Sequence, residues 1–382
     1  MKVLHVWLVL LLSMSLILSV GVVRADSEEN NSRIQGLEER VEYLEESLAT
    51  ALNILNHLRY EDGVINGLNG PHVIFEGANV HVQKGSSLPS VDGINGVGNL
   101  IVGDNKCPED DVDCENMVVG RGGSHNLVVG NEHQYSSING FVAGVANYIT
   151  GRHASVSGGL YNTASGHSAS VSGGKSNIAS NKRASVSGGT HNTASGNGSS
   201  VSGGGGNTAS GDRTSVNGGF VNLASGIIAS VHGGAWNTAS GYFSNISGGV
   251  WNTASGPDSS VTGGHYNTAS GRATSVSGGT FNTASEHGAS VSGGQSNTAD
   301  GAGASISGGF SNTASNNVSS VSGGEHNTAS GDLASVSGGV YNTASGDRSS
   351  VSGGRYNTAS HDYSTVSGGL SQATVAIHDH IP

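Results

Sequence analysis

Polar and apolar residues alternate in a unit of fifteen residues along more than half of the chain. From Ala154 to about Leu370 the unit reads A/S-S-V-S-G-G-x-x and then N-T-A-S-G-x-x, so it splits into eight and seven residues. Valine recurs in the first half and alanine in the second, between serines and threonines. Because alternate residues of a strand point to opposite faces, the pattern predicts two short strands per unit, with Val or Ala facing inward.

The glycines between these strands predict tight corners, because glycine accepts backbone angles that other residues avoid. We therefore predict an all-β repeat solenoid, a parallel β-roll of fifteen-residue coils over residues 152–370, each coil rising about 4.8 Å above the last. A C-terminal tail follows at residues 371–382. Asn162 and its equivalents also fall on the inward face. Stacked asparagines can form a ladder that satisfies backbone groups at the corners.

Residues 63–151 predict an irregular β region that leads into the repeats. The phrase Asn-x-apolar-x-Gly begins at Asn99, Asn116, Asn126 and Asn147, first at irregular and then at regular spacing. This is typical of the capping region of a solenoid. Residues on both sides of these strands are apolar, which indicates that both faces are covered, and a sister chain is the obvious candidate for the outer face.

Heptads precede the β region and predict a coiled-coil oligomerisation segment at residues 26–62. The seam consists of Ile34, Val41, Leu48 and Leu55 at one position, and Leu37, Leu44, Ala51 and Leu58 at the other. Side chains spaced alternately by three and four residues form a stripe that partner helices bury. Leu52 and Ile54 widen it, which favours three or more helices. The alternative is one amphipathic helix packed on its own domain.

The N-terminus has the pattern of a secretory signal peptide over residues 1–25. Lys2 precedes an apolar run from Val3 to Val23, and small residues end at Ala25. The protein is therefore expected to be secreted, either extracellular or at the cell surface. The run is close to the roughly 20 residues that cross a bilayer, so an uncleaved anchor is the alternative. Only in that case do we expect a membrane partner.

The net charge and the cysteines give further information on possible partners and on covalent structure. The formal net charge of −12 argues against nucleic acid as a partner. Cys107 and Cys114 are the only cysteines, and in an exported chain they are expected to form one disulfide that closes a small loop. The acidic residues between them, at 109–113, offer oxygen ligands for calcium, but they lack the glycine and the ligand order of a known calcium loop. A solvated acidic loop is the simpler interpretation.

Motifs of catalysis are missing from the sequence. We find no G-x-S-x-G, H-E-x-x-H, P-loop or G-x-G-x-x-G, and the sixteen histidines are scattered. His378, Asp379 and His380 offer metal ligands, although a frayed tail explains them as well. We therefore expect a protein that is not an enzyme, with no cofactor, no catalytic residues and no metal site.

The tandem phrase S-V-S-G-G-x-x-N-T-A-S-G resembles the head repeats of trimeric autotransporter adhesins, over roughly residues 97–370. This resemblance implies left-handed β-rolls in a parallel homotrimer that binds host or matrix surfaces. In that family the coiled coil follows the head, whereas here the heptads precede it. A weaker resemblance is to the β-roll of grass ice-recrystallisation inhibitors. Their pattern xxNxVxG matches residues 160–166 except that Ala164 replaces the valine.

Binding is expected where the repeat varies, in the two positions that follow Gly-Gly. The second position holds an aromatic residue in seven coils, at Tyr161, Trp236, Trp251, Tyr266, Phe281, Tyr341 and Tyr356. A column of aromatic side chains on a rigid edge can bind sugar rings or protein, which favours an adhesive protein that attaches to glycan or matrix. The alternative is that these rings cover neighbouring coils or the seam between chains.

Ice binding is the second functional hypothesis. Threonine fills twelve of the fourteen positions from Thr163 to Thr358, and Ile178 and Leu223 interrupt the rank. The ice-binding candidates are Thr163, Thr193, Thr208, Thr238, Thr253, Thr268 and Thr283. Regular ranks of hydroxyl and methyl groups on a flat face are what this activity needs. A monomer favours ice binding and a trimer favours adhesion, so the oligomeric state separates the two hypotheses.

Overall fold

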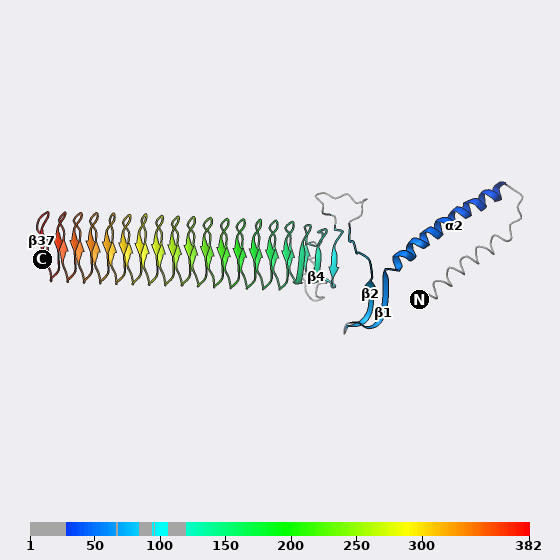
Figure 1. Ribbon diagram of the computed structural model, residues 1–382, viewed down its shortest axis with the longest axis horizontal. Coiled ribbons are helices and arrows are strands. Elements are labelled where there is room, and N and C mark those ends of the chain that lie inside the picture. The colour runs from blue at the N-terminus through cyan, green and yellow to red at the C-terminus, as the bar shows by residue number, and fades with distance from the viewer. Residues whose placement is uncertain (1–27, 66–67, 84–93, 95, 106–119) are drawn as a thin grey trace. The chain divides into compact units, whose positions relative to one another are not determined.

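The computed structural model describes residues 28–65, 68–83, 94, 96–105 and 120–382 (Figure 1). It divides into two units, Met1–His81 and Val82–Pro382, which we describe separately. The predicted signal peptide at residues 1–25 and the predicted disulfide between Cys107 and Cys114 lie outside the described residues. Within those residues, no helix is both long and apolar enough to cross a membrane.

The first unit consists of one helix and one β-hairpin. Helix α2 spans Glu28–Leu55, and β1 (Leu58–Ile65) pairs antiparallel with β2 (Leu68–Phe75). The helix therefore ends before the predicted limit of the coiled-coil segment at residue 62. Leu58, the last seam residue of the heptad pattern, is the first residue of β1. Leucines of the seam are exposed on the isolated helix, including Leu44 with 60% of its surface accessible.

The second unit is a parallel β-solenoid of about 17 coils, which confirms the predicted fold class. We call its two faces the valine sheet and the alanine sheet. The valine sheet begins with β3 (Leu100–Val102), β4 (Leu127–Asn131) and β6 (Phe141–Val145), and each strand pairs in parallel with the next. It continues from β8 (Ser155–Val156) and β10 (Ser170–Val171), one strand every fifteen residues, to β36 (Thr365–Val366) and finally β37 (His380–Ile381).

The alanine sheet has sixteen strands in sequence order. It begins with β5 (Gln134–Tyr135) and β7 (Tyr148–Ile149), continues with β9 (Thr163–Ala164) and β11 (Ile178–Ala179), and ends at β35 (Thr358–Ala359). Neighbouring strands pair without a shift, so that Thr193 lies beside Thr208 and Ala194 beside Ala209. Each repeat position therefore forms a straight column along the solenoid (Figure 1).

The core is a thin layer between the two sheets. Val156, Ala164 and Asn162 are completely buried, as are nearly all their equivalents in later coils. Ser155 and Thr163, their strand neighbours, face outward and are partly exposed. The alternation predicted from the sequence is confirmed, because a two-residue strand can place only one side chain on each face.

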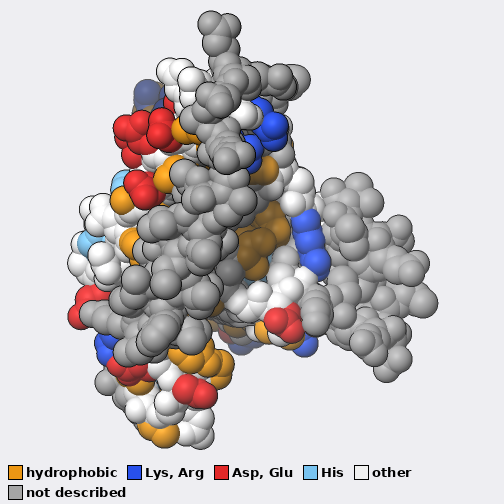
Figure 2. Space-filling model, turned by 90° about the vertical axis from the view of Figure 1, so that its right-hand side faces the viewer, with side chains coloured by type: hydrophobic (Ala, Val, Ile, Leu, Met, Phe, Trp, Pro, Cys, Tyr) orange, Lys and Arg blue, Asp and Glu red, His pale blue; other side chains and the backbone are white. Residues whose placement is uncertain are grey.

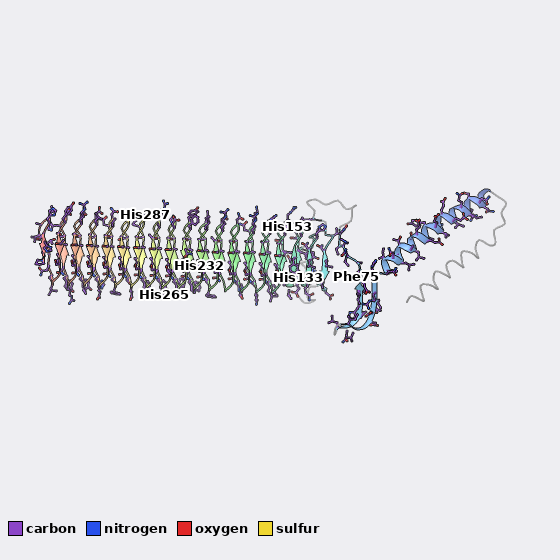
Figure 3. The ribbon with its side chains drawn as sticks, in the orientation of Figure 1. Phe75, His133, His153, His232, His265 and His287 are labelled. Atoms are coloured by element: carbon purple, nitrogen blue, oxygen red, sulfur yellow. The ribbon has the colours of Figure 1, made fainter. Side chains whose placement is uncertain are left out.

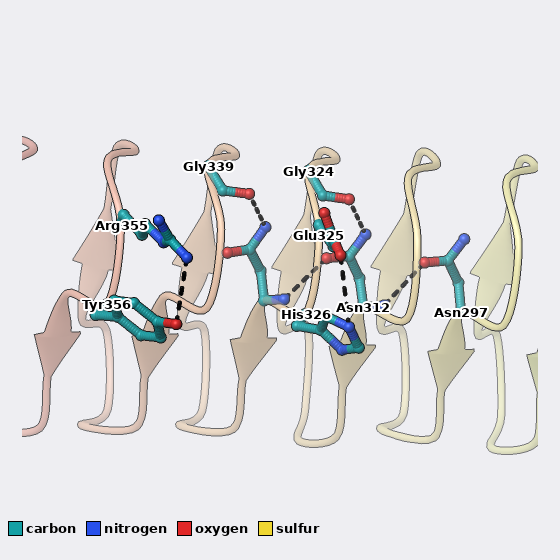
Figure 4. Close-up of polar contacts among 9 residues, drawn as sticks. Asn297, Asn312, Gly324, Glu325, His326, Gly339, Arg355 and Tyr356 are labelled. Carbon is teal, nitrogen blue, oxygen red and sulfur yellow. Dashed lines mark hydrogen bonds and ion pairs between the residues drawn. The ribbon is translucent and has the colours of Figure 1, made fainter.

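A ladder of buried asparagines joins the coils from within. In each rung the asparagine Oδ1 accepts the backbone N–H of the next asparagine, as from Asn312 to Asn297 at 3.0 Å (Figure 4). The asparagine Nδ2 donates to two glycine carbonyls, those of Gly308 and Gly324 in the case of Asn312. Two of these three bonds, to the Gly308 carbonyl and from the N–H of the next asparagine, satisfy backbone groups that have no other partner among the described residues, whereas the Gly324 carbonyl also accepts the N–H of Phe310. The predicted structural role of the asparagines is confirmed.

The entry coils differ from the repeats on their outer face. Leu100, Leu127 and Phe141 form an outward rank on the valine sheet, and the next member of the rank is Ser155. Leu100 and Leu127 are exposed, and Phe141 is half-buried. The predicted second apolar face is therefore present, and no other element of the described chain covers Leu100 and Leu127.

Candidate binding surfaces

Two corners join the valine sheet and the alanine sheet, and they lie on opposite edges of the solenoid. The aromatic corner consists of the two positions that follow Gly-Gly, such as Val250 and Trp251. The variable corner consists of the two positions that follow Ala-Ser-Gly, such as Pro257 and Asp258. Figure 3 shows His265, from the aromatic corner, on one edge and His153 and His287, from the variable corner, on the other. A ligand can therefore contact one corner without the other.

The second position of the aromatic corner is held in the left-handed backbone region. Trp236 and Trp251, for example, have φ values of 59° and 58°. The N–H of Trp251 donates to the carbonyl of Ala235 in the preceding coil at 3.0 Å, and this bond holds the backbone so that the Cα–Cβ bond points outward. The backbone therefore presents one side chain outward at the same point in every coil.

Four of the predicted aromatic residues form one continuous stack. Trp236 and Trp251 have ring centroids 4.8 Å apart and planes 7° apart. Trp251 stacks on Tyr266 at 5.9 Å, and Tyr266 stacks on Phe281 at 5.0 Å. These distances are close to the rise per coil of about 4.8 Å, so the column geometry alone brings the rings into contact.

The stack leaves ring edges exposed and closes most ring faces. Trp236, Trp251 and Tyr266 are each about 40% exposed, at 39%, 43% and 41%, whereas Phe281 at the end of the stack is 53% exposed. The residue that follows Phe281 in the column is Ser296, so one face of Phe281 has no ring across it within the described chain. The surface is thus an apolar strip of ring edges with an open face at one end.

The remaining predicted aromatic residues are less continuous. Tyr341 and Tyr356 stack at 5.2 Å, and Tyr161 has no ring neighbour among the described residues. Two residues that sequence reasoning missed extend the stacks. Phe220 packs edge-on against Trp236, and His326 stacks on Tyr341. His326 lies in the same column fifteen residues before Tyr341, so its spacing was the signal that identifies it.

The predicted threonine rank lies on the outer face of the alanine sheet. All seven candidates, Thr163, Thr193, Thr208, Thr238, Thr253, Thr268 and Thr283, are partly exposed and are the first residues of their strands. Pairs such as Thr253 and Thr268 lie side by side in the sheet register. Ile178 and Leu223 occupy the same rank in their coils. The structure thus brings the threonines into one straight rank on one face.

His133 is a functional candidate that sequence reasoning did not identify. It is completely buried and occupies the rung of the asparagine ladder before Asn147. Its Nδ1 accepts the N–H of Asn147, and its Nε2 donates to the carbonyl of Val129 at 2.9 Å. Burial lowers the pKa of His133, because a charged ring loses its hydration there. The two hydrogen bonds require the neutral ring with its proton on Nε2.

Neither a search for metal ligands nor a comparison with known proteins identifies a further site. Within the described residues, no three side chains of His, Cys, Asp or Glu gather in a way that could hold a metal ion. No family model matches the chain, and no curated protein matches it. The solenoid therefore has to be interpreted from its own geometry.

Proposed function

We propose that the chain is a secreted, non-catalytic fibrous protein that assembles as a parallel homotrimer and attaches to glycan or matrix surfaces. The observation that carries the proposal is the stack from Trp236 to Phe281 on the aromatic corner. A solenoid with a solid core has no interior room for a ligand, so binding has to use its outer surface. Each coil offers a small contact, and strength comes from several coils that act together.

The apolar strip suits an extended partner. Aromatic side chains provide the largest apolar contact per residue, and their edges are aligned along successive coils. Because most ring faces are occupied by neighbouring rings, a sugar can stack flat only at an open end such as Phe281. Contacts along the rest of the strip are made with ring edges. A partner with its own repeat, such as a polysaccharide or a fibrous matrix protein, matches this arrangement.

Two features support self-association. The seam of α2 carries exposed leucines, and the outer rank of the entry coils carries Leu100 and Leu127. Partner chains would remove both surfaces from water. Each Å² of apolar surface that becomes buried would stabilise the assembly by roughly 25 cal/mol. The net charge argues against nucleic acid as a partner. Acidic as well as basic side chains are present on the face that Figure 2 shows.

Loss of the stack tests the adhesive function. Trp236, Trp251, Tyr266 and Phe281 are replaced together by Ser, and attachment to glycan and matrix surfaces is measured beside the β-sheet circular dichroism. We expect attachment to be lost while the spectrum is kept. Replacement of Phe243 and Tyr363, the two aromatic residues in the equivalent position of the variable corner, by Ser is the matched control and should leave attachment intact.

Ice binding is the second candidate function, and the threonine rank of the alanine sheet favours it. Threonines in unshifted parallel register present hydroxyl and methyl groups at the coil spacing. Replacement of Thr238, Thr253, Thr268 and Thr283 by Tyr should abolish any inhibition of ice growth and leave attachment unchanged. If this set alone removes the activity of the protein and the aromatic set does not, ice binding is the function and the adhesive proposal is wrong.

A further inference from the structure

At the end nearest the helix, the two faces of the β-hairpin that follows α2 differ: one carries apolar side chains, and the other carries Arg59 and Glu61 beside Ile74. Residues of β1 and β2 that lie directly opposite each other share a face, and so do residues two positions apart. Leu58 pairs with Phe75 and Tyr60 pairs with Val73, which places these four side chains on one face next to the end of the helix. We call them the hairpin apolar face. Tyr60, Val73 and Phe75 are 54%, 65% and 57% exposed.

The opposite face of the hairpin satisfies its own polar groups. Arg59 forms ion pairs there with Glu61 and with Glu76, which follows the end of β2. A two-stranded hairpin is marginally stable in water unless one face packs against another element. The exposed hairpin apolar face is therefore the side that needs a partner.

The hairpin is fastened to the end of the helix. His57 lies between α2 and β1, and its N–H donates to the carbonyl of Ile54 at 3.1 Å. Its carbonyl accepts the N–H of Glu76 at 2.9 Å, and its ring Nδ1 lies 3.0 Å from the carbonyl oxygen of Glu76. The end of the second strand is thus held at the end of the helix. Figure 3 shows Phe75 on the hairpin close to the helix.

The apolar seam of the helix runs into this face. Leu55 is the last seam residue within α2, and Leu58, the next seam residue, is the first residue of the hairpin apolar face. The residues beside the seam indicate what covers it. Arg33 and Arg40 precede the seam residues Ile34 and Val41, whereas Glu38 and Glu45 follow Leu37 and Leu44.

These charges favour a second copy of the same chain in parallel register. In a parallel coiled coil the residue before the first seam position faces the residue five positions later on its neighbour. Arg33 then meets the neighbour's Glu38 and Arg40 meets its Glu45, so both pairs are attractive. In an antiparallel pair arginines face arginines and glutamates face glutamates, which is repulsive.

We propose that the hairpin apolar face continues the helical seam and is buried against the same face of other copies, as a β-collar at the end of the coiled coil. This inference rests on the proposed self-association of the chain. Parallel register brings the ends of the helices together, and each hairpin is held at the end of its helix. The apolar faces of the copies then meet, whereas the Arg59 faces stay in water.

Cysteine cross-linking tests the collar in the full-length protein. Val73 and Ile74 are adjacent β-branched residues on opposite faces of β2, so Val73→Cys and Ile74→Cys are a matched pair. On mild oxidation, V73C should give covalent oligomers. The yield of covalent oligomers from I74C should be no higher than that from the unmodified chain, which measures any cross-linking through Cys107 and Cys114. Replacement of Tyr60 and Val73 together by Thr should weaken association at least roughly tenfold, because two apolar side chains are no longer buried, whereas I74T should not.

The outcomes separate the collar from the self-association on which it rests. A full-length chain that sediments as a monomer overturns both. If the chain is oligomeric and Leu44→Asp with Leu48→Asp makes it monomeric, self-association through α2 stands. The collar is nevertheless wrong if, in that oligomer, V73C cross-links no better than I74C and the Tyr60 and Val73 variant associates as tightly as the unmodified chain.

Discussion

The two corners of the solenoid have the same backbone conformation but carry different side chains. The second residue of each corner has φ between 52° and 61° wherever it is not glycine, from His153 to His378. In both corners its N–H bonds to the preceding coil, as Trp251 does to Ala235 and Asp258 to Tyr242. Aromatic residues nevertheless fill this position in seven of fifteen coils at the aromatic corner, and only as Phe243 and Tyr363 at the variable corner. The backbone does not account for that difference.

Local energetics do not require the aromatic residues either. The left-handed region costs a residue with a side chain about 1–2 kcal/mol, and glycine avoids that cost. The aromatic column uses glycine once, at Gly206. Stacked rings gain about 0.5–1.5 kcal/mol per pair, which roughly offsets the strain. The comparison therefore teaches that the fold fixes the position and direction of the column but does not by itself select aromatic residues for it.

The aromatic corner is also the more firmly anchored of the two. In the coil of Asn267, the asparagine side chain makes three hydrogen bonds beneath the aromatic corner. Its bonds to Gly263 and Asn282 are the only ones that these two backbone groups make among the described residues. At the variable corner, Thr274 makes a single hydrogen bond to the carbonyl of Gly271, and Ala289 takes the equivalent place in the next coil. A rigid corner is the better platform for repeated weak contacts, since less motion has to be frozen on binding.

The largest expected effect comes from breaking that anchor. Asn267→Ala should lower the free energy of unfolding by about 2–6 kcal/mol, because the buried Asn282 N–H and the half-buried Gly263 carbonyl lose their partners. Thr274→Ala, its counterpart at the variable corner, should cost only about 1 kcal/mol. Guanidinium unfolding of both variants measures this. Equal losses would show that the two corners are anchored equally.

Glycine replacement should give the next largest difference. Gly264 has φ of 85°, and a Cβ there would lie 2.2 Å from the carbonyl oxygen of Gly279, so Gly264→Ala should cost about 2–5 kcal/mol. Gly271→Asn at the variable corner should cost less, about 1–2 kcal/mol. A Cβ there would lie 2.4 Å from the carbonyl oxygen of Ser285, so the coil has to shift, but Gly271 does not have a positive φ, and Asn181 and Asn316 already occupy its equivalents in other coils. Melting curves of the two variants compare them directly. If Gly271→Asn lowers the melting temperature more than Gly264→Ala does, the variable corner is the less tolerant of the two and the expected order is wrong.

A smaller effect is expected from pH, and it should act on the ladder beneath the aromatic corner. Burial holds the pKa of His133 below its ordinary 6.5. As pH falls below 6.5 the unfolded chain takes up a proton at this residue that the folded chain resists, so stability decreases until the pH reaches the lowered pKa. Above pH 6.5 the group contributes no pH dependence.

His133→Asn is the control for this effect, since asparagine fills the same rung in later coils. Melting temperatures of both proteins are measured from pH 7.5 to 5. The unmodified chain should lose more stability on acidification than the variant. Parallel curves would mean that His133 does not control the stability of the entry coils.

The sequence predicted the solenoid well because its information is repeated in every coil. Val171 and Ala179 each follow an outward Ser or Ile, and the period of fifteen leaves one arrangement that buries both. The inward position of Asn177 followed from the same alternation. A repeat determines its own register, because a single residue that departs from the pattern lies between coils that follow it.

The first unit was predicted less well because it has no repeat. The heptad spacing continues to Leu58, but hydrogen bonds to Phe75 and its neighbours hold that residue in a strand. The dipeptide Asn66-Gly67, which is favoured between hairpin strands, was the signal for this hairpin. The column that brings Trp236 and Trp251 together followed from the repeat, but the near-parallel arrangement of their ring planes depends on side-chain rotamers and could not be predicted. The burial of His133, which takes the place of an asparagine, could not be predicted either.

The most direct test of the account replaces Trp236, Trp251, Tyr266 and Phe281 with Asn, a residue that tolerates the left-handed region. Melting temperature and attachment to glycan and matrix surfaces are measured on the same preparation. The account predicts a melting temperature within a few degrees of the unmodified chain, because lost stacking and relieved strain roughly cancel, together with loss of attachment. A large fall in melting temperature with attachment retained by the folded protein would contradict it, because the aromatic column would then serve the fold and not binding.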